Sequence, residues 1–302
     1  KSRPFNYVIV VIALFFCFVS YQFKDLKSDL TVDSIIQNLL VLGLLIFSMF
    51  LTNFIAKRND LNKNNSYTLL FHLISLLFFP IIFKDLKLVL ASFFIILAMR
   101  RMISLQSMQS VKEKIFDASL WIFVASLFHF WAILFIILVF ISIISHVSRD
   151  YRNWVVPFIA LVAVTLLFFL VNSFFDNSLL SSLLSKTYIS FDFYYFENIY
   201  QRLAFALFTS LSLFAFVLQI FDIPNKALNM QSSHKTILFS FLLGIGIYII
   251  SANKNNGSLA FCFGPLAIIG ANFIEKMESK WLKEIMVYAL VGCAVFFYVL
   301  QL

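Results

Sequence analysis

Residues 115–147 have the sequence IFDASLWIFVASLFHFWAILFIILVFISIISHV, and this run decides the fold. An apolar run of 33 residues is too long for one membrane helix, which takes about 17–25 residues, and just long enough for two. We predict two short helices, 115–130 and 131–147, because His129 and Trp131 are typical of the interface between lipid and water. Such a hairpin returns the chain to the side from which it entered and fixes the side of every later loop.

Nine more stretches are apolar enough to enter a bilayer. With the two halves of the hairpin they make eleven predicted segments: 7–23, 34–55, 66–83, 86–102, 115–130, 131–147, 154–175, 202–221, 236–251, 259–274 and 285–302. The chain is 62% hydrophobic and 13% charged, whereas a soluble domain is about 45–50% apolar and about 25% charged. We therefore predict an all-α fold, a polytopic transmembrane helix bundle of 10–11 segments. It forms one domain over residues 1–302, with no soluble domain.

The basic residues between the segments indicate the orientation. With the N-terminus in the cytoplasm, 16 Lys and Arg residues fall on the cytoplasmic side and 7 on the other. Cytoplasmic loops carry such an excess, so we predict a multi-pass protein of the inner membrane with a cytoplasmic N-terminus. The net charge of +8 is then explained by contact with anionic membrane lipids, and no nucleic-acid partner is expected.

One candidate site lies at the predicted cytoplasmic mouth of the fourth and fifth segments. It comprises five charged residues: Arg100, Arg101, Lys112, Lys114 and Asp117. Adjacent arginines can bind a phosphate through two hydrogen bonds, and a carboxylate is favourable near the start of a helix. The cluster is thus a candidate for binding a phosphorylated lipid headgroup. Positive-inside anchoring with a capping carboxylate is the alternative.

A second candidate site is the long connection before the eighth segment, which we predict to lie outside. Its candidate residues are Asp192, Tyr194, Tyr195 and Glu197. Carboxylates beside aromatic rings are typical of sugar handling, the carboxylate for acid–base work and the ring for stacking. An interfacial belt of aromatic residues with solvated acids is the alternative.

Polar and helix-breaking residues inside the segments are further candidates. His72 and Asn53 lie at predicted membrane depth, where polar groups are costly and mark functional sites or join helices. Gly264 and Pro265 can break the tenth segment and create a binding site, or form a tolerated kink. The three cysteines have neither metal-binding nor disulfide spacing. We expect no metal site and no cofactor.

Several strings in the chain are familiar in their order. They are SRPFNY at residues 2–7, RRMISLQS at 100–107, KIFDASLW at 114–121, YRNWVVPF at 151–158 and GANFIE at 270–275. The chain therefore resembles the integral-membrane family called domain of unknown function 6427. That resemblance implies a Bacteroidota inner membrane and supplies no catalytic residues.

Members of that family often carry the name beta-carotene monooxygenase. An iron-dependent oxygenase needs clustered His and carboxylate ligands. The four histidines, His72, His129, His146 and His234, are too scattered in the sequence to suggest one.

Three functions remain open from the sequence. The leading hypothesis is an envelope-biogenesis protein that binds or moves a lipid-linked intermediate, such as a polyprenyl phosphate or a glycolipid. The alternatives are a non-catalytic subunit that has partner membrane proteins, and a small-solute or ion transporter that uses Gly264 and Pro265. No residue pattern decides whether the protein is an enzyme.

Overall fold

The fold is an all-α bundle. The computed structural model describes residues 4–23, 32–63, 65–147, 150–175, 178–184, 187–191, 193, 198–252 and 254–302. These parts contain twelve α-helices, five short 3-10 helices and no strand. The α-helices are α1 (Pro4–Phe23), α2 (Val32–Arg58), α3 (Tyr67–Phe78), α4 (Leu86–Ile103), α5 (Val111–Phe128), α6 (Ile136–His146), α7 (Arg152–Phe174), α8 (Ser178–Leu184), α9 (Ile199–Asp222), α10 (Leu228–Ile250), α11 (Ala260–Lys276) and α12 (Lys280–Gln301).

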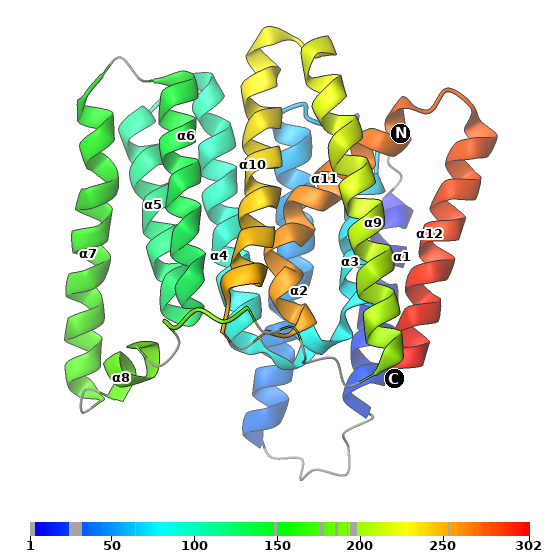
Figure 1. The fold of residues 1–302 in the computed structure, drawn as a ribbon, viewed down its shortest axis with the longest axis horizontal. Coiled ribbons are helices and arrows are strands. Elements are labelled where there is room, and N and C mark those ends of the chain that lie inside the picture. Colours follow the sequence, from blue (N-terminus) through cyan, green and yellow to red (C-terminus); the bar gives the residue numbers. More distant parts are fainter. Residues whose placement is uncertain are drawn as a thin grey trace.

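Apart from the short α8, successive helices run up and down the bundle (Figure 1). Eight helices in the described parts are long and apolar enough to cross a membrane, by length and composition. Two apolar stretches are shorter, Tyr67–Phe78 and Phe130–His146. The remaining predicted segment, 115–130, corresponds to α5, whose first two turns carry four charged residues. The chain is thus a multi-pass helical membrane protein.

The predicted hairpin is present, with its break at His129. The backbone of His129 is extended, at φ −136° and ψ 102°, which ends α5 at Phe128. A 3-10 helix, η3 (Phe130–Phe135), then turns the chain into α6. The start of α5 and the end of α6 line one cavity, so the chain does return to the side from which it entered.

The predicted segment 66–83 is wrong as a single helix. α3 ends at Phe78, and a 3-10 helix, η1 (Pro80–Lys84), follows it. Proline disfavours the helical conformation in the residue before it, and Phe79 accordingly leaves the helix at φ −134° and ψ 71°.

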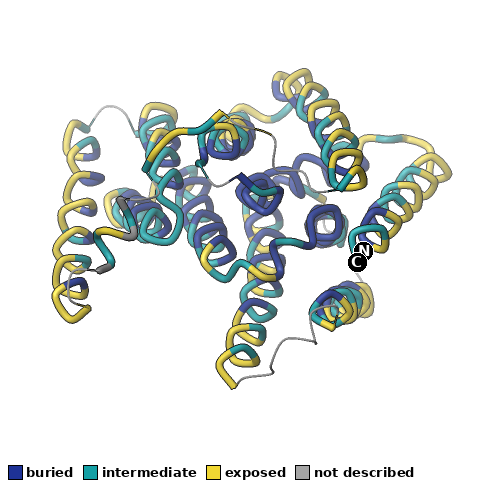
Figure 2. The backbone as a smooth tube through the Cα atoms, turned by 60° about the horizontal axis from the view of Figure 1, so that its bottom comes forward, coloured by how far each residue is buried: buried dark blue, intermediate teal, exposed yellow. Residues whose placement is uncertain are grey.

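α11 is the centre of the bundle. Within its membrane-length window 94% of the residues are buried, against 17% for α12 and 22% for α7. Figure 2 shows this contrast, with buried residues in the middle of the bundle and exposed residues on the peripheral helices. The exposed faces of those helices carry Phe, Leu, Ile and Val side chains. A soluble protein does not expose so much apolar surface, whereas lipid tails cover it.

One end of the bundle is strongly basic. It holds the last turns of α2, α4, α9 and α11 and the first turns of α5, α7, α10 and α12, and is uppermost in Figure 1. Of the seventeen Lys and Arg residues in the described parts, thirteen lie in the half of the bundle nearest this end. We call it the basic end.

Candidate functional site

The predicted headgroup cluster does not converge on one point. Arg100 and Arg101 are neighbours in α4, so the helix turns their side chains about 100° apart. Arg101 Nη2 forms an ion pair with Asp117 Oδ2 of α5 at 2.7 Å. The Arg100 guanidinium lies 5.0 Å from the ring centre of Phe54 on α2. The two arginines therefore hold α4 against different neighbours.

The two lysines of the cluster also separate. Lys114 Nζ donates to the Ser104 carbonyl at 2.8 Å and to Ser107 Oγ at 2.6 Å. Lys114 thus gives a hydrogen-bond partner to the carbonyl group that follows the end of α4. Lys112 Nζ forms an ion pair with Asp150 Oδ2 at 3.7 Å. Lys112 also lines a cavity at the basic end.

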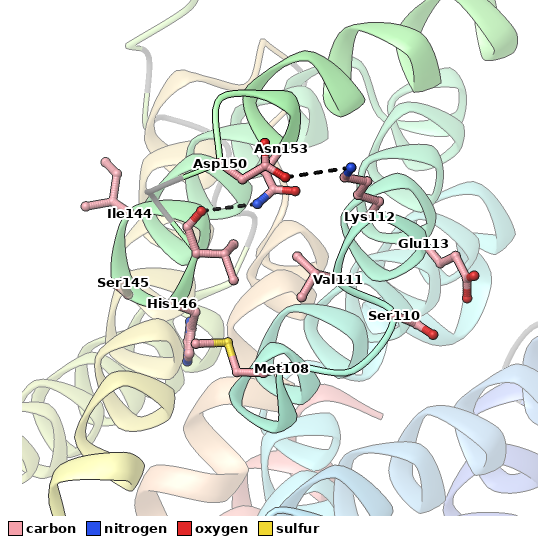
Figure 3. A pocket seen from close by; sticks show the side chains of 11 residues that line it. Met108, Ser110, Val111, Lys112, Glu113, Ile144, Ser145, His146, Asp150 and Asn153 are labelled. Atoms are coloured by element: carbon pink, nitrogen blue, oxygen red, sulfur yellow. Dashed lines mark hydrogen bonds and ion pairs between the residues drawn. The ribbon is translucent and has the colours of Figure 1, made fainter.

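That cavity, which we call the α5–α7 cavity, has a volume of about 800 Å³. Its walls come from the start of α5, the end of α6 and the start of α7: Met108, Ser110, Val111, Lys112, Glu113, Ile144, Ser145, His146, Val147, Asp150 and Asn153. Figure 3 shows Asp150, Asn153 and Lys112 together on one side, with His146 and Met108 on the opposite side.

The predicted intramembrane candidates are buried between helices. His72 is 2% exposed and Asn53 is 7% exposed. His72 Nδ1 and Asn53 Oδ1 have no hydrogen-bond partner among the described residues. One turn before His72, Thr68 Oγ1 accepts a hydrogen bond of 3.0 Å from Asn62 Nδ2, which also donates to the Ile268 carbonyl of α11 at 3.4 Å. Polar contacts thus join α3 to α11 inside the bundle.

Gly264 and Pro265 lie in an unbroken helix, since α11 continues through both residues. A Cβ atom on Gly264 would lie 3.3 Å from Ile96 of α4 and 3.6 Å from Thr52 Oγ1 of α2. The glycine therefore allows close packing of three helices. The transporter hypothesis has no broken helix to build on.

The outer-loop candidates Asp192, Tyr194, Tyr195 and Glu197 lie outside the described residues.

A charged cluster that the sequence analysis missed lies at the basic end of α9, α10 and α11. Asp222 is 5% exposed and forms ion pairs with Lys226 Nζ, at 3.3 Å, and with Lys276 Nζ. Beside it, Gln219 Nε2 hydrogen-bonds to His234 Nδ1 at 3.1 Å, and both side chains are buried. We call Asp222, Lys226 and Lys276 the Asp222 cluster.

The Asp222 cluster adjoins a cavity of about 350 Å³ that we call the polar cavity. Gln219, Asp222, Asn225 and Lys276 supply its polar lining.

An apolar groove begins where the polar cavity ends. It has a volume of about 120 Å³ and is lined by α3, α9, α11 and α12, with Ala215 and Phe273 shared between the two cavities. α9 and α12 lie close together at the end opposite the basic end and diverge toward the basic end (Figure 1). We call this the lateral groove, because it lies between two helices whose outer faces are exposed.

Comparison with known proteins places the chain in a family. The model of the family described as "Family of unknown function (DUF6427)" matches residues 1–302, the whole chain. The chain belongs to the DUF6427 family. No curated protein and no solved structure gives a significant match.

The described residues of this DUF6427 member contain no group of three or more His, Cys, Asp or Glu side chains that could hold a metal ion. Three of the histidines lie at different sites. His146 lines the α5–α7 cavity, His129 lines a small cavity at the opposite end of the bundle, and His234 lies beside the Asp222 cluster.

The Asp222 cluster of this DUF6427 member was not visible in the sequence for a simple reason. Lys226 and Lys276 count there only among the basic residues of the predicted cytoplasmic side, and no pattern singles out Asp222. What could have drawn attention to them is that Asp222 and Lys226 are four residues apart, a spacing that favours an ion pair on a helix.

Proposed function

We propose that the protein binds a lipid-linked intermediate of envelope biogenesis, such as a polyprenyl phosphate, in the lateral groove. The hydrocarbon chain would lie between α9 and α12, and the phosphate would lie at Lys276 and Lys226. One observation carries the proposal: an apolar groove continues into a polar cavity with a lysine at the basic end.

The lateral groove suits a hydrocarbon chain. Its only hydroxyl groups belong to Ser75 and Ser212, and each donates to a carbonyl of its own helix, at 2.9 Å in both cases. The groove therefore has no free polar group for a ligand, and its surface is aromatic and aliphatic. Inside a bilayer such a surface gains affinity from close packing, because lipid tails are as apolar as the groove. Selectivity must come from the headgroup.

The Asp222 cluster suits a phosphate. Two lysines face a single carboxylate, which leaves one net positive charge. The Lys276 side chain is 45% exposed, whereas the Asp222 side chain is only 6% exposed. An incoming phosphate would thus meet the ammonium group before the carboxylate. A charge-assisted hydrogen bond of this kind contributes about 1.5–3 kcal/mol.

We also propose that the basic end faces the cytoplasm and that the protein lies in the inner membrane. The clustering of basic residues at one end of the bundle supports this orientation. The N-terminal end of α1 is then cytoplasmic, and the groove would take its ligand from the cytoplasmic leaflet.

Filling the groove tests the proposal. Ala215 lies where the groove meets the polar cavity, so the substitution Ala215→Phe would block the path between chain and phosphate sites. We expect polyprenyl phosphate binding in nanodiscs, measured by native mass spectrometry, to fall about tenfold or more, equivalent to about 1.4 kcal/mol. Polyprenol, which lacks the phosphate, should bind wild type more weakly than polyprenyl phosphate.

The matched control is Ala206→Phe, because Ala206 lies on the same helix and is exposed. It should leave binding unchanged. Equal binding of the phosphate and the alcohol by wild type, or equal binding by both phenylalanine variants, would refute a lipid-phosphate site in the lateral groove.

A further inference from the structure

We propose that the α5–α7 cavity is a second binding site, for a water-soluble phosphorylated polyol such as a sugar phosphate. Lys112 and the first turn of α5 would hold the phosphate, and His146 and Asn153 would accept hydrogen bonds from the hydroxyl groups. The site is independent of the lipid-phosphate proposal, because it lies on the opposite flank of the bundle from α9 and α12 (Figure 1).

His146 presents a hydrogen-bond acceptor. Its Nδ1 lies 3.1 Å from the Ser142 carbonyl oxygen, which can only accept, so the proton of a neutral ring is on Nδ1. Nε2 then carries a lone pair. Nε2 is buried and has no hydrogen-bond partner among the described residues. A ligand hydroxyl that displaced the side chains covering Nε2 would find an acceptor there.

Asn153 presents a second acceptor. The residue is 3% exposed, and its Nδ2 donates to the Val147 carbonyl at 3.1 Å, which fixes the orientation of the amide. Its Oδ1 has no hydrogen-bond partner among the described residues. A buried acceptor without a partner is unfavourable, so a ligand that donates to it recovers that free energy.

The cavity also presents donors, on the side where Asn153 lies (Figure 3). Lys112 pairs with Asp150 at 3.7 Å, but its side chain is 49% exposed, so a phosphate can compete with Asp150 for the ammonium group. No side chain caps the first turn of α5, whose backbone N–H groups favour an anion. Two acceptors, together with a cationic group and the N–H groups of a helix start in the same cavity, match a molecule that has both hydroxyls and a phosphate.

The loop before α5 is held in a strained conformation at this cavity. Met108 and Ser110 both line it, and both have left-handed backbones, with φ of 55° and 45°. Non-glycine residues in this region are strained and gather at ligand sites. The walls come from helix ends rather than helix middles, so the ligand would arrive from water.

Calorimetric titration of the full-length protein in nanodiscs tests the site, with glucose 1-phosphate, glucose and inorganic phosphate as separate ligands. We expect glucose 1-phosphate to bind with a Kd below about 1 mM and at least about tenfold more tightly than glucose or phosphate. Lys112→Gln should weaken glucose 1-phosphate and phosphate about fivefold or more. His146→Phe should weaken glucose 1-phosphate and leave phosphate unchanged.

Lys235→Gln is the control, since Lys235 is an exposed lysine in the same half of the bundle and does not line the cavity. It should leave all three titrations unchanged. The wild-type titrations decide the matter even if a variant fails to fold. No saturable binding of glucose 1-phosphate, or binding no tighter than that of inorganic phosphate, would overturn the proposal.

Discussion

Valine at position 244 should prevent stable folding, whereas valine at position 246 should be tolerated. Gly244 lies where α10 meets α11. A Cβ atom there would lie 2.7 Å from Cys262 Sγ and 3.1 Å from the backbone carbon of Phe261. Backbone cannot move aside as a flexible side chain does, and overpacking of a core costs about 1–3 kcal/mol or more. Valine adds two methyl groups to this clash, so we expect little monodisperse protein in detergent.

Gly246 is the matched control on the same helix. A Cβ atom on Gly246 meets nothing within 4 Å. Gly246→Val should therefore elute as a single peak with a melting temperature equal to wild type or higher, because glycine costs about 1 kcal/mol in a helix. Cys262→Ala should partly rescue Gly244→Ala by removing the sulfur. If both valine variants melt alike, α10 and α11 do not pack as described.

Charge reversal at Lys276 should have the largest effect on ligand binding. Lys276→Glu would place a second carboxylate beside Asp222, which is 5% exposed, and leave Lys226 as the one remaining cation of the cluster. The variant loses a charge-assisted hydrogen bond and adds repulsion toward phosphate. We therefore expect polyprenyl phosphate binding to fall about 100-fold, equivalent to about 2.7 kcal/mol. The melting temperature should also fall, because the two carboxylates repel each other.

Two further variants separate these effects. Lys280→Glu changes an exposed lysine at the start of α12, near the same end of the bundle, and should change polyprenyl phosphate binding far less. The double substitution Asp222→Lys with Lys276→Glu restores an ion pair of reversed sign and should recover much of the lost melting temperature. If Lys280→Glu weakens binding as much as Lys276→Glu, the effect is one of general surface charge, and the Asp222 cluster is not the phosphate site.

The helices could be predicted from sequence because a bilayer imposes a length and an apolar composition on each segment. Even the hairpin at 115–147 followed from length and from His129 and Trp131. The break at Phe79 was missed, although Pro80 marked it, because the apolar run continues across it. Local hydropathy predicts where apolar chain lies and is less informative about where a helix ends.

The site could not be predicted in the same way. Arg100 and Arg101 are adjacent in sequence, and the turn of the helix directs them to different partners. Asp222 and Lys276 are far apart in sequence and meet only because α9 and α11 pack together at the basic end. Burial of the carboxylate, which distinguishes this cluster from ordinary surface charges, is a tertiary property.

The most direct test of a lipid-phosphate site is an experimental structure of the protein in nanodiscs with polyprenyl phosphate added. The predicted result is a continuous chain of density in the lateral groove, beside Phe71 and Leu290, that ends in a phosphate within hydrogen-bond distance of Lys276 Nζ. Phosphate density elsewhere on the protein, with the lateral groove occupied only by the phospholipid of the nanodisc, would contradict it.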